Sequence, residues 1–251
     1  MMDDARETQV LDALVSFVDR LLVDVDVVDL LIELTERCAE LFDVAAGFLL
    51  ADQFGKLNLL AASSEQAREL ELFQLRANEG PCLGCYASGE PVSVADLHGA
   101  VLRWPRFVPA ALDAGFGSVD AVPMCAAGDV VGALGLFAVR PDALTDADRH
   151  LAQTLAHIVC VTIVQDLSPA RPSLLPQLRA AFAARVVVDQ ATSFLREVLG
   201  VSVEDAFEIL RAYARARGEH LSHVARRLMT DKYSRPVLVA AILEFAGEVR
   251  D

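Results

Sequence analysis

The chain has 251 residues, of which 54% are hydrophobic and 23% charged, and its net charge at pH 7 is −14. This composition is typical of a globular protein rather than a disordered one, and the length accommodates two domains. The sequence contains no apolar run of about 18 residues and no basic N-terminal segment followed by an apolar core. We therefore expect no membrane span and no secretory signal. We expect the protein to be cytoplasmic.

Charge is distributed unevenly along the chain. Residues 1–170 hold 10 basic and 26 acidic side chains, a net charge of −16, whereas residues 171–251 hold 12 and 10, a net charge of +2. An acidic surface repels nucleic acid, so any contact with RNA is expected in the last third of the chain. The chain has five widely spaced cysteines, and reduced thiols are the expectation for them.

The first part of the chain mixes helices with short strands. Amphipathic helices are predicted at about 5–22 and 27–42, with apolar stripes typical of core or dimer packing. The further elements predicted here are strands at 45–51, 57–62, 91–94, 119–124 and 130–137, and helices at 65–75, 81–88, 103–114 and 145–167. The predicted order has helices first, then a mostly antiparallel sheet interrupted by helices, and last a long exit helix. This order is an α+β pattern.

The exit helix carries a short heptad-like pattern. Leu151, Leu155, Ile158 and Thr162 follow the 4-3-4 spacing of a coiled-coil seam, and they fit packing onto the sheet equally well. Pro169 and Pro172 then break the helix. The predicted organisation is a first domain at 1–168, a linker at 169–173 and a second domain at 174–251.

The second part of the chain predicts a small helical bundle. One helix ends near Gly200, and the next begins at Val203 behind a capping box of Ser202 and Asp205. Gly218 ends that helix, and a short third helix follows with its apolar face at Leu221, Val224, Ala225 and Leu228. Three amphipathic helices of this size can share one core. A further helix is predicted at 236–249.

Positive charge gathers in one segment of this bundle. Residues 211–235 hold seven basic side chains against Glu219 and Asp231, on a chain that is otherwise strongly acidic. An anionic partner is the first candidate explanation for such a cluster. A solvated helix face is the alternative, because ordinary helices often carry arginine.

The sequence from Arg185 to Ala225, RVVVDQATSFLREVLGVSVEDAFEILRAYARARGEHLSHVA, resembles the ANTAR domain, a three-helix RNA-binding module of transcription antiterminators. The resemblance covers roughly residues 178–229. It implies binding of hairpins in nascent RNA, and we assign the contacts to Arg185, Gln190, Arg211, Arg215 and Arg217. The family usually has Lys-Gly where this chain has Thr192-Ser193. A positive charge is therefore missing from a position that could face RNA.

The first domain resembles the GAF domain, a small-molecule sensing module, over about residues 30–165. The resembling motifs are Glu79-Gly80-Pro81-Cys82, Gly89-Glu90-Pro91-Val92, Trp104-Pro105 and Gly132-Ala133-Leu134-Gly135. The resemblance implies an α+β GAF domain with a central antiparallel sheet flanked by helices, followed by the all-α ANTAR bundle with its extra C-terminal helix. It also implies a ligand pocket lined by residues 78–120, without fixing the ligand or any cofactor.

The pair Cys82 and Cys85 is the one apparent chemical motif in this domain. The spacing suits a redox pair at a helix start, and it supplies two of the four ligands of a metal site, but no second pair exists. Structural cysteines are the third interpretation and the one we favour, with no metal and no catalytic residue. Tyr86 and Trp104 are further candidates for the pocket. Some GAF-like proteins reduce free methionine sulfoxide, for which Cys125 would be a third candidate.

We therefore interpret the sequence as a cytoplasmic, dimeric regulator that is not an enzyme. Its GAF domain senses a small molecule or a redox signal, and its ANTAR domain binds RNA. Two alternatives for the second domain are a DNA-binding helix-turn-helix and a protein-interaction module.

Overall fold

The computed structural model describes residues 26–52, 54–126, 128–165, 174–231, 233 and 235–250. The chain divides into two compact units. Unit 1 contains Leu30–Arg179, and unit 2 contains Val25–Asp29 together with Ala180–Asp251. The helix predicted at 5–22 and the linker predicted at 169–173 lie outside the described residues.

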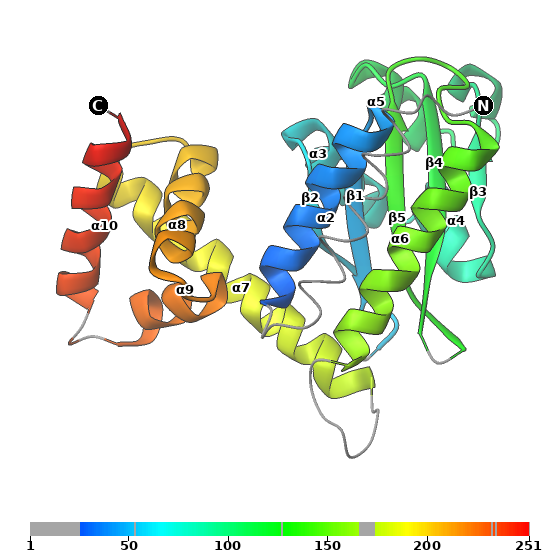
Figure 1. The fold of residues 1–251 in the computed structure, drawn as a ribbon. Coiled ribbons are helices and arrows are strands. Elements are labelled where there is room, and N and C mark those ends of the chain that lie inside the picture. Colours follow the sequence, from blue (N-terminus) through cyan, green and yellow to red (C-terminus); the bar gives the residue numbers. More distant parts are fainter. Residues whose placement is uncertain are drawn as a thin grey trace. The chain divides into compact units, whose positions relative to one another are not determined.

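Unit 1 is built on a five-stranded sheet with the strand order β2-β1-β5-β4-β3 (Figure 1). The strands are β1 Ala45–Ala51, β2 Leu57–Ala62, β3 Val92–Val94, β4 Ser118–Ala126 and β5 Asp129–Ala138. All neighbouring strands are antiparallel. The α+β prediction with a central antiparallel sheet is thus confirmed.

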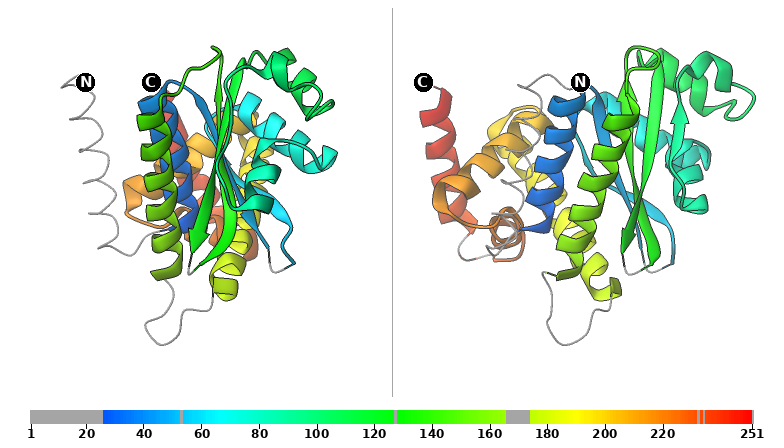
Figure 2. Two further views of the ribbon diagram at one scale, coloured as in Figure 1. Left: turned by 90° about the vertical axis from the view of Figure 1, so that its right-hand side faces the viewer. Right: turned by 45° about the vertical axis from the view of Figure 1, so that its right-hand side comes forward.

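Helices cover both faces of this sheet, as the edge-on view in Figure 2 shows. One face carries α2 Val27–Phe42 and α6 Asp146–Gln165. The other carries α3 Glu65–Ala77, α4 Pro81–Ser88, the short η1 Leu97–Ala100 and α5 Phe107–Asp113. Because both faces are covered, the central strands are almost continuously apolar, as in the fully buried run of β5 from Val131 to Ala138.

Most helix ends of unit 1 follow local sequence signals. Ser64 accepts a hydrogen bond from the Ala67 N–H at the start of α3. Thr145 and Asp148 cap α6 reciprocally, with distances of 2.8 Å and 3.2 Å between backbone nitrogen and side-chain oxygen. Both starts were predicted from the sequence.

The helix predicted from residue 103 begins instead at Phe107, after the short η1 turn. The reason is a cap supplied from another part of the chain. The Glu79 carboxylate accepts hydrogen bonds from the backbone N–H groups of Arg106 and Phe107, the latter at 2.8 Å. This long-range cap fixes the first turn of α5 beyond Pro105.

Unit 2 is helical. Its helices are α7 Leu174–Leu199, which starts before the division between the units, α8 Val203–Arg217, α9 Leu221–Thr230 and α10 Arg235–Arg250. Ser202 caps α8 as predicted, and Gly218 ends it in the left-handed conformation with φ of 63°. The extra helix α10 covers the bundle, with Phe245 packed edge-on against Tyr213 at 5.7 Å between ring centroids.

Within the described residues, no helix combines the length and the apolar character needed to cross a lipid bilayer.

Candidate nucleic-acid interface and sensor core

The basic side chains predicted to bind RNA lie on two helices of unit 2. Arg211, Arg215 and Arg217 are on α8, and Arg185 and Gln190 are on α7. Gln190, Arg215 and Arg217 are exposed and Arg185 is half-buried, but Arg211 is only 3% exposed. The structure therefore separates Arg211 from the other candidates, because a buried guanidinium requires a charged or hydrogen-bonding partner.

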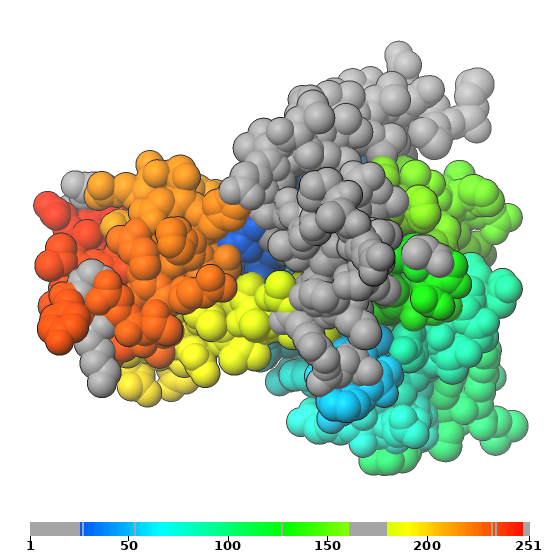
Figure 3. Space-filling view, turned by 90° about the horizontal axis from the view of Figure 1, so that it is seen from below, coloured from blue at the N-terminus to red at the C-terminus, as the bar shows by residue number. Residues whose placement is uncertain are grey.

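Asp29 is that partner. The Arg211 Nε donates to the Asp29 Oδ1 at 2.9 Å, and the Arg215 Nη2 lies 3.4 Å from the same oxygen. Asp29 belongs to unit 2, although it precedes the rest of that unit by about 150 residues of sequence. Two of the predicted RNA contacts are thus held by one carboxylate at the start of α2. Figure 3 shows part of the surface of α8, α9 and α10 in orange and red.

A second carboxylate of the same turn contacts α9. The Asp26 Oδ1 accepts from the Val28 N–H at 2.9 Å, while its Oδ2 accepts from the Ser222 N–H at 2.6 Å. His220, the N-cap residue of α9, makes no side-chain capping bond. One carboxylate therefore caps the N-termini of both α2 and α9.

Arg217 and Arg185, two other predicted RNA contacts, interact with side chains of their own helices. Arg217 lies over the Tyr213 ring at 5.4 Å, and Arg185 pairs with Asp189 one turn away at 3.1 Å. Both arrangements leave the guanidinium group at the surface of its helix or close to it. Arg215 and Arg217 together form an exposed pair at the end of α8.

The structure corrects the expectation that position 192, where the family usually has lysine, could face RNA. The Thr192 side chain is only 4% exposed, and its hydroxyl donates to the Val188 carbonyl at 2.9 Å. The position faces the core of unit 2 rather than a nucleic-acid surface. The following residue, Ser193, is exposed.

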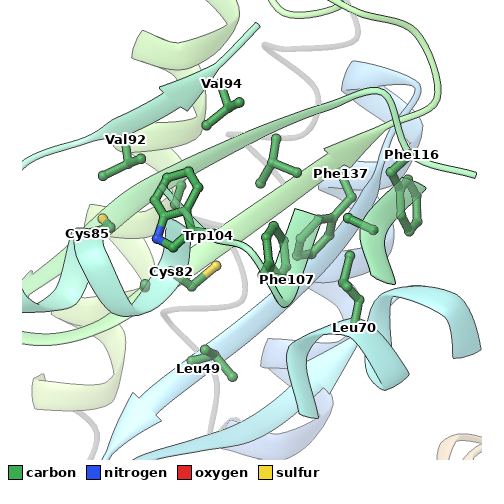
Figure 4. Packing of buried hydrophobic residues seen from close by; sticks show 14 of the residues in the cluster. Leu49, Leu70, Cys82, Cys85, Val92, Val94, Trp104, Phe107, Phe116 and Phe137 are labelled. Atoms are coloured by element: carbon green, nitrogen blue, oxygen red, sulfur yellow. The ribbon is translucent and has the colours of Figure 1, made fainter. Parts of the chain in front are cut away.

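The residues predicted to line a ligand pocket in unit 1 pack into one apolar cluster (Figure 4). Cys82 and Cys85 are fully buried and Trp104 is 7% exposed, whereas Tyr86 is half-buried at the margin of the cluster. Trp104 lies between α4 and the two valines of β3, with its ring edge-on to Phe107 at 6.4 Å. The predicted pocket lining is thus part of the hydrophobic core.

A buried polar cluster adjoins these cysteines, and sequence reasoning missed it. Glu71 on α3 is fully buried, its Oε2 accepts from the Gln74 Nε2 at 2.9 Å, and its Oε1 accepts from the Cys82 thiol at 3.5 Å. A methyl group at Gly135 would lie 2.4 Å from that Oε1, so the glycine makes room for the carboxyl. Burial raises the pKa of Glu71 to about 8, partly opposed by the thiol hydrogen bond.

Burial also suppresses ionisation of the two thiols. It raises the pKa of Cys85 to about 12, and burial together with the neighbouring Glu71 raises the pKa of Cys82 well above its usual value of 9. Both are free thiols. Across the described residues, no group of three metal-ligating side chains comes together. Burial and the raised pKa of both thiols are consistent with the structural interpretation of Cys82 and Cys85.

We predict that Cys82 and Cys85 resist alkylation in the folded protein. At pH 7.5 iodoacetamide should modify the half-buried Cys125 first, and Cys82 and Cys85 at least about a hundredfold more slowly, because only thiolates react. Mass spectrometry of timed digests measures this, and the protein unfolded in guanidinium serves as the control. Equal modification rates for Cys82 and Cys125 would contradict the burial argument.

The Glu71 carboxyl predicts a pH dependence of stability. The unfolded chain releases this proton near the usual pKa of 4.5, whereas the folded protein keeps it up to about 8. Stability contributed by the buried neutral acid is complete below 4.5 and is lost at about 1.4 kcal/mol per pH unit up to 8. Urea unfolding of Glu71→Gln should show a flatter profile across this window.

The matched control for that experiment is Glu69→Gln, which removes an exposed carboxylate from the same helix. Its profile should follow that of the unsubstituted protein. A slope that is the same in all three proteins would mean that Glu71 is ionised in the folded state.

Comparison with known proteins assigns both parts of the chain. The GAF domain family matches residues 24–164, and the ANTAR domain family matches residues 176–229. No protein of curated function matches the sequence significantly.

Solved structures resemble unit 1. The GAF domain of an Acinetobacter phosphoenolpyruvate-protein phosphotransferase is 16% identical, with a TM-score of 0.51 over 68% of this chain and 100% of that one. A free methionine-R-sulfoxide reductase from Neisseria meningitidis, in complex with its substrate, is 18% identical, with a TM-score of 0.49 over 72% and 96%. At this identity the first similarity supports the fold and nothing about ligand or activity.

ANTAR domains bind RNA hairpins, and their presence implies RNA-binding antitermination. The GAF match covers more than half of the chain and is followed directly by the ANTAR match. The chain therefore belongs to the GAF domain family and is a GAF–ANTAR antitermination regulator.

Proposed function

We propose that this protein is a signal-responsive regulator that binds hairpins in nascent transcripts and so prevents a terminator from folding. The observation that carries the proposal is the exposed arginine pair, Arg215 and Arg217, on the ANTAR domain of an otherwise acidic chain. Proteins that recognise RNA hairpins combine phosphate contacts with contacts to unstacked loop bases. Guanidinium groups suit both tasks, since they pair with phosphate and stack on bases.

The proposed RNA contacts divide by their environment. Arg215 and Arg217 are the principal contacts, because both are exposed in the last turn of α8. Gln190 is exposed on α7 and, together with Arg185, assists from that helix. Arg211 is buried against Asp29, so its contribution depends on that carboxylate.

We propose that the GAF domain is the sensor and performs no catalysis. The burial and raised pKa of Cys82 and Cys85 argue against nucleophilic thiols, and so favour a small-molecule signal over thiol oxidation. The regulator is cytoplasmic, where nascent transcripts would be accessible, and acts as a homodimer. The nature of the ligand is left open by the residues in unit 1.

The test of this function is binding of the full chain to an RNA with two adjacent short hairpins, measured at two salt concentrations. Tight, loop-dependent and salt-sensitive binding is expected. A DNA duplex of the same sequence separates the alternatives. Preference for the duplex would indicate a helix-turn-helix, and binding to neither would indicate a protein-interaction module.

Replacing the exposed arginine pair should weaken this binding. For Arg215→Ala combined with Arg217→Ala we expect an affinity about tenfold lower or more, and a smaller slope of log affinity against log salt, by roughly one per lost phosphate contact. The measurement is fluorescence anisotropy with the two-hairpin RNA.

The matched control is Arg37→Ala combined with Arg68→Ala. It also removes two exposed positive charges, but from unit 1, where each arginine pairs with a glutamate three residues away. This variant should bind like the unsubstituted protein. If both double variants lose affinity equally, overall charge rather than the α8 surface is responsible.

A further inference from the structure

We propose that Asp26 and Asp29 occupy an anion-binding site on the ANTAR domain that takes RNA phosphate when the first turn of α2 withdraws. The acidic turn and the RNA would then compete for the same donors. This inference rests on the proposed RNA-binding function and adds a mode of regulation to it.

The site is formed by donors from two helices. Arg211 and Arg215 on α8 present guanidinium groups to Asp29 at 2.9 Å and 3.4 Å, and the Ser222 N–H at the start of α9 points to Asp26 at 2.6 Å. Guanidinium groups and helix N-terminal amides are the donors that proteins use for phosphate. Two carboxylates of one turn fill these positions in the structure.

The burial of Arg211 shows that the site requires an anion. At 3% exposure its guanidinium has lost most of its contact with water, so a negative group must compensate its charge. Asp29, whose side chain is 16% exposed, now fills this role. A phosphate at the same position would also satisfy the guanidinium, but only after the carboxylate has left, because two anions repel each other.

The competing segment is well placed to carry a signal. Asp29 lies within α2, a continuous helix from Val27 to Phe42. Its first turn belongs to unit 2, whereas its residues from Leu30 onward belong to the sensor unit. A signal that shifts this helix would change the occupancy of the anion site. By linkage, RNA binding would in turn favour release of the turn.

The decisive variant is Asp29→Asn in the full chain. The asparagine oxygen can still accept the Arg211 hydrogen bond, but the competing charge is gone. We expect this variant to bind the two-hairpin RNA about tenfold more tightly than the unsubstituted protein, within the usual range of allosteric coupling. The control is Glu40→Gln, the same change of charge on the exposed face of α2, which should leave affinity unchanged.

Two outcomes would overturn the proposal, and they are distinguishable. If the unsubstituted protein binds RNA and Asp29→Asn binds no more tightly than Glu40→Gln, competition is refuted while the function stands. If none of the three proteins binds RNA, the proposed function is refuted and this inference with it.

A measurement on the unsubstituted protein tests the proposal even if the Asp29→Asn variant fails to fold. The backbone N–H groups of Val28 and Asp29 both point to the Asp26 Oδ1. Saturating two-hairpin RNA should accelerate hydrogen exchange in a peptide spanning these residues, because the turn leaves its site and loses the burial that leaves Val28 only 2% exposed. Unchanged or slower exchange with RNA bound would refute the withdrawal.

Discussion

The ion pair between Arg211 and Asp29 is the constraint on which unit 2 depends. Arg211 lies in the buried face of α8 between Leu210 and Ala214, so its guanidinium is carried into the bundle with the apolar residues. The ANTAR match at 176–229 does not contain the counter-charge. The first turn of α2 supplies it, together with the cap of α9 from Asp26. The helical domain is therefore completed by a segment from the other end of the sequence.

Unit 1 also contains a buried ionisable side chain, which is accommodated in a different way. Glu71 is buried without a cation among its hydrogen-bond partners, and it remains neutral at moderate pH because burial raises its pKa to about 8. The neutral acid and Gln74 position the start of α4, and with it Cys82. Burial and the raised pKa make this thiol a poor nucleophile.

Local signals in the sequence predicted much of the fold. The caps at Ser64, Thr145 and Ser202 lie within three residues of the groups that they satisfy, so a short window of sequence contains both partners. The start of α5 was predicted wrongly, because Glu79 caps it from 28 residues away. The ion pair of Asp29 with Arg211 was not predicted for the same reason, since 182 residues of sequence separate the two. The inward orientation of Thr192 likewise depends on packing and not on residue type.

The most direct test of the central claim is the NMR signal of the Arg211 Nε–H group during titration with the two-hairpin RNA. In the free protein this group is buried and bonded to Asp29, so its resonance should be sharp and slow to exchange with water. If RNA replaces the carboxylate, the resonance should shift with the fraction of RNA bound and disappear from its original position at saturation. An Arg211 resonance that stays in place while RNA saturates the protein would contradict the exchange of carboxylate for phosphate.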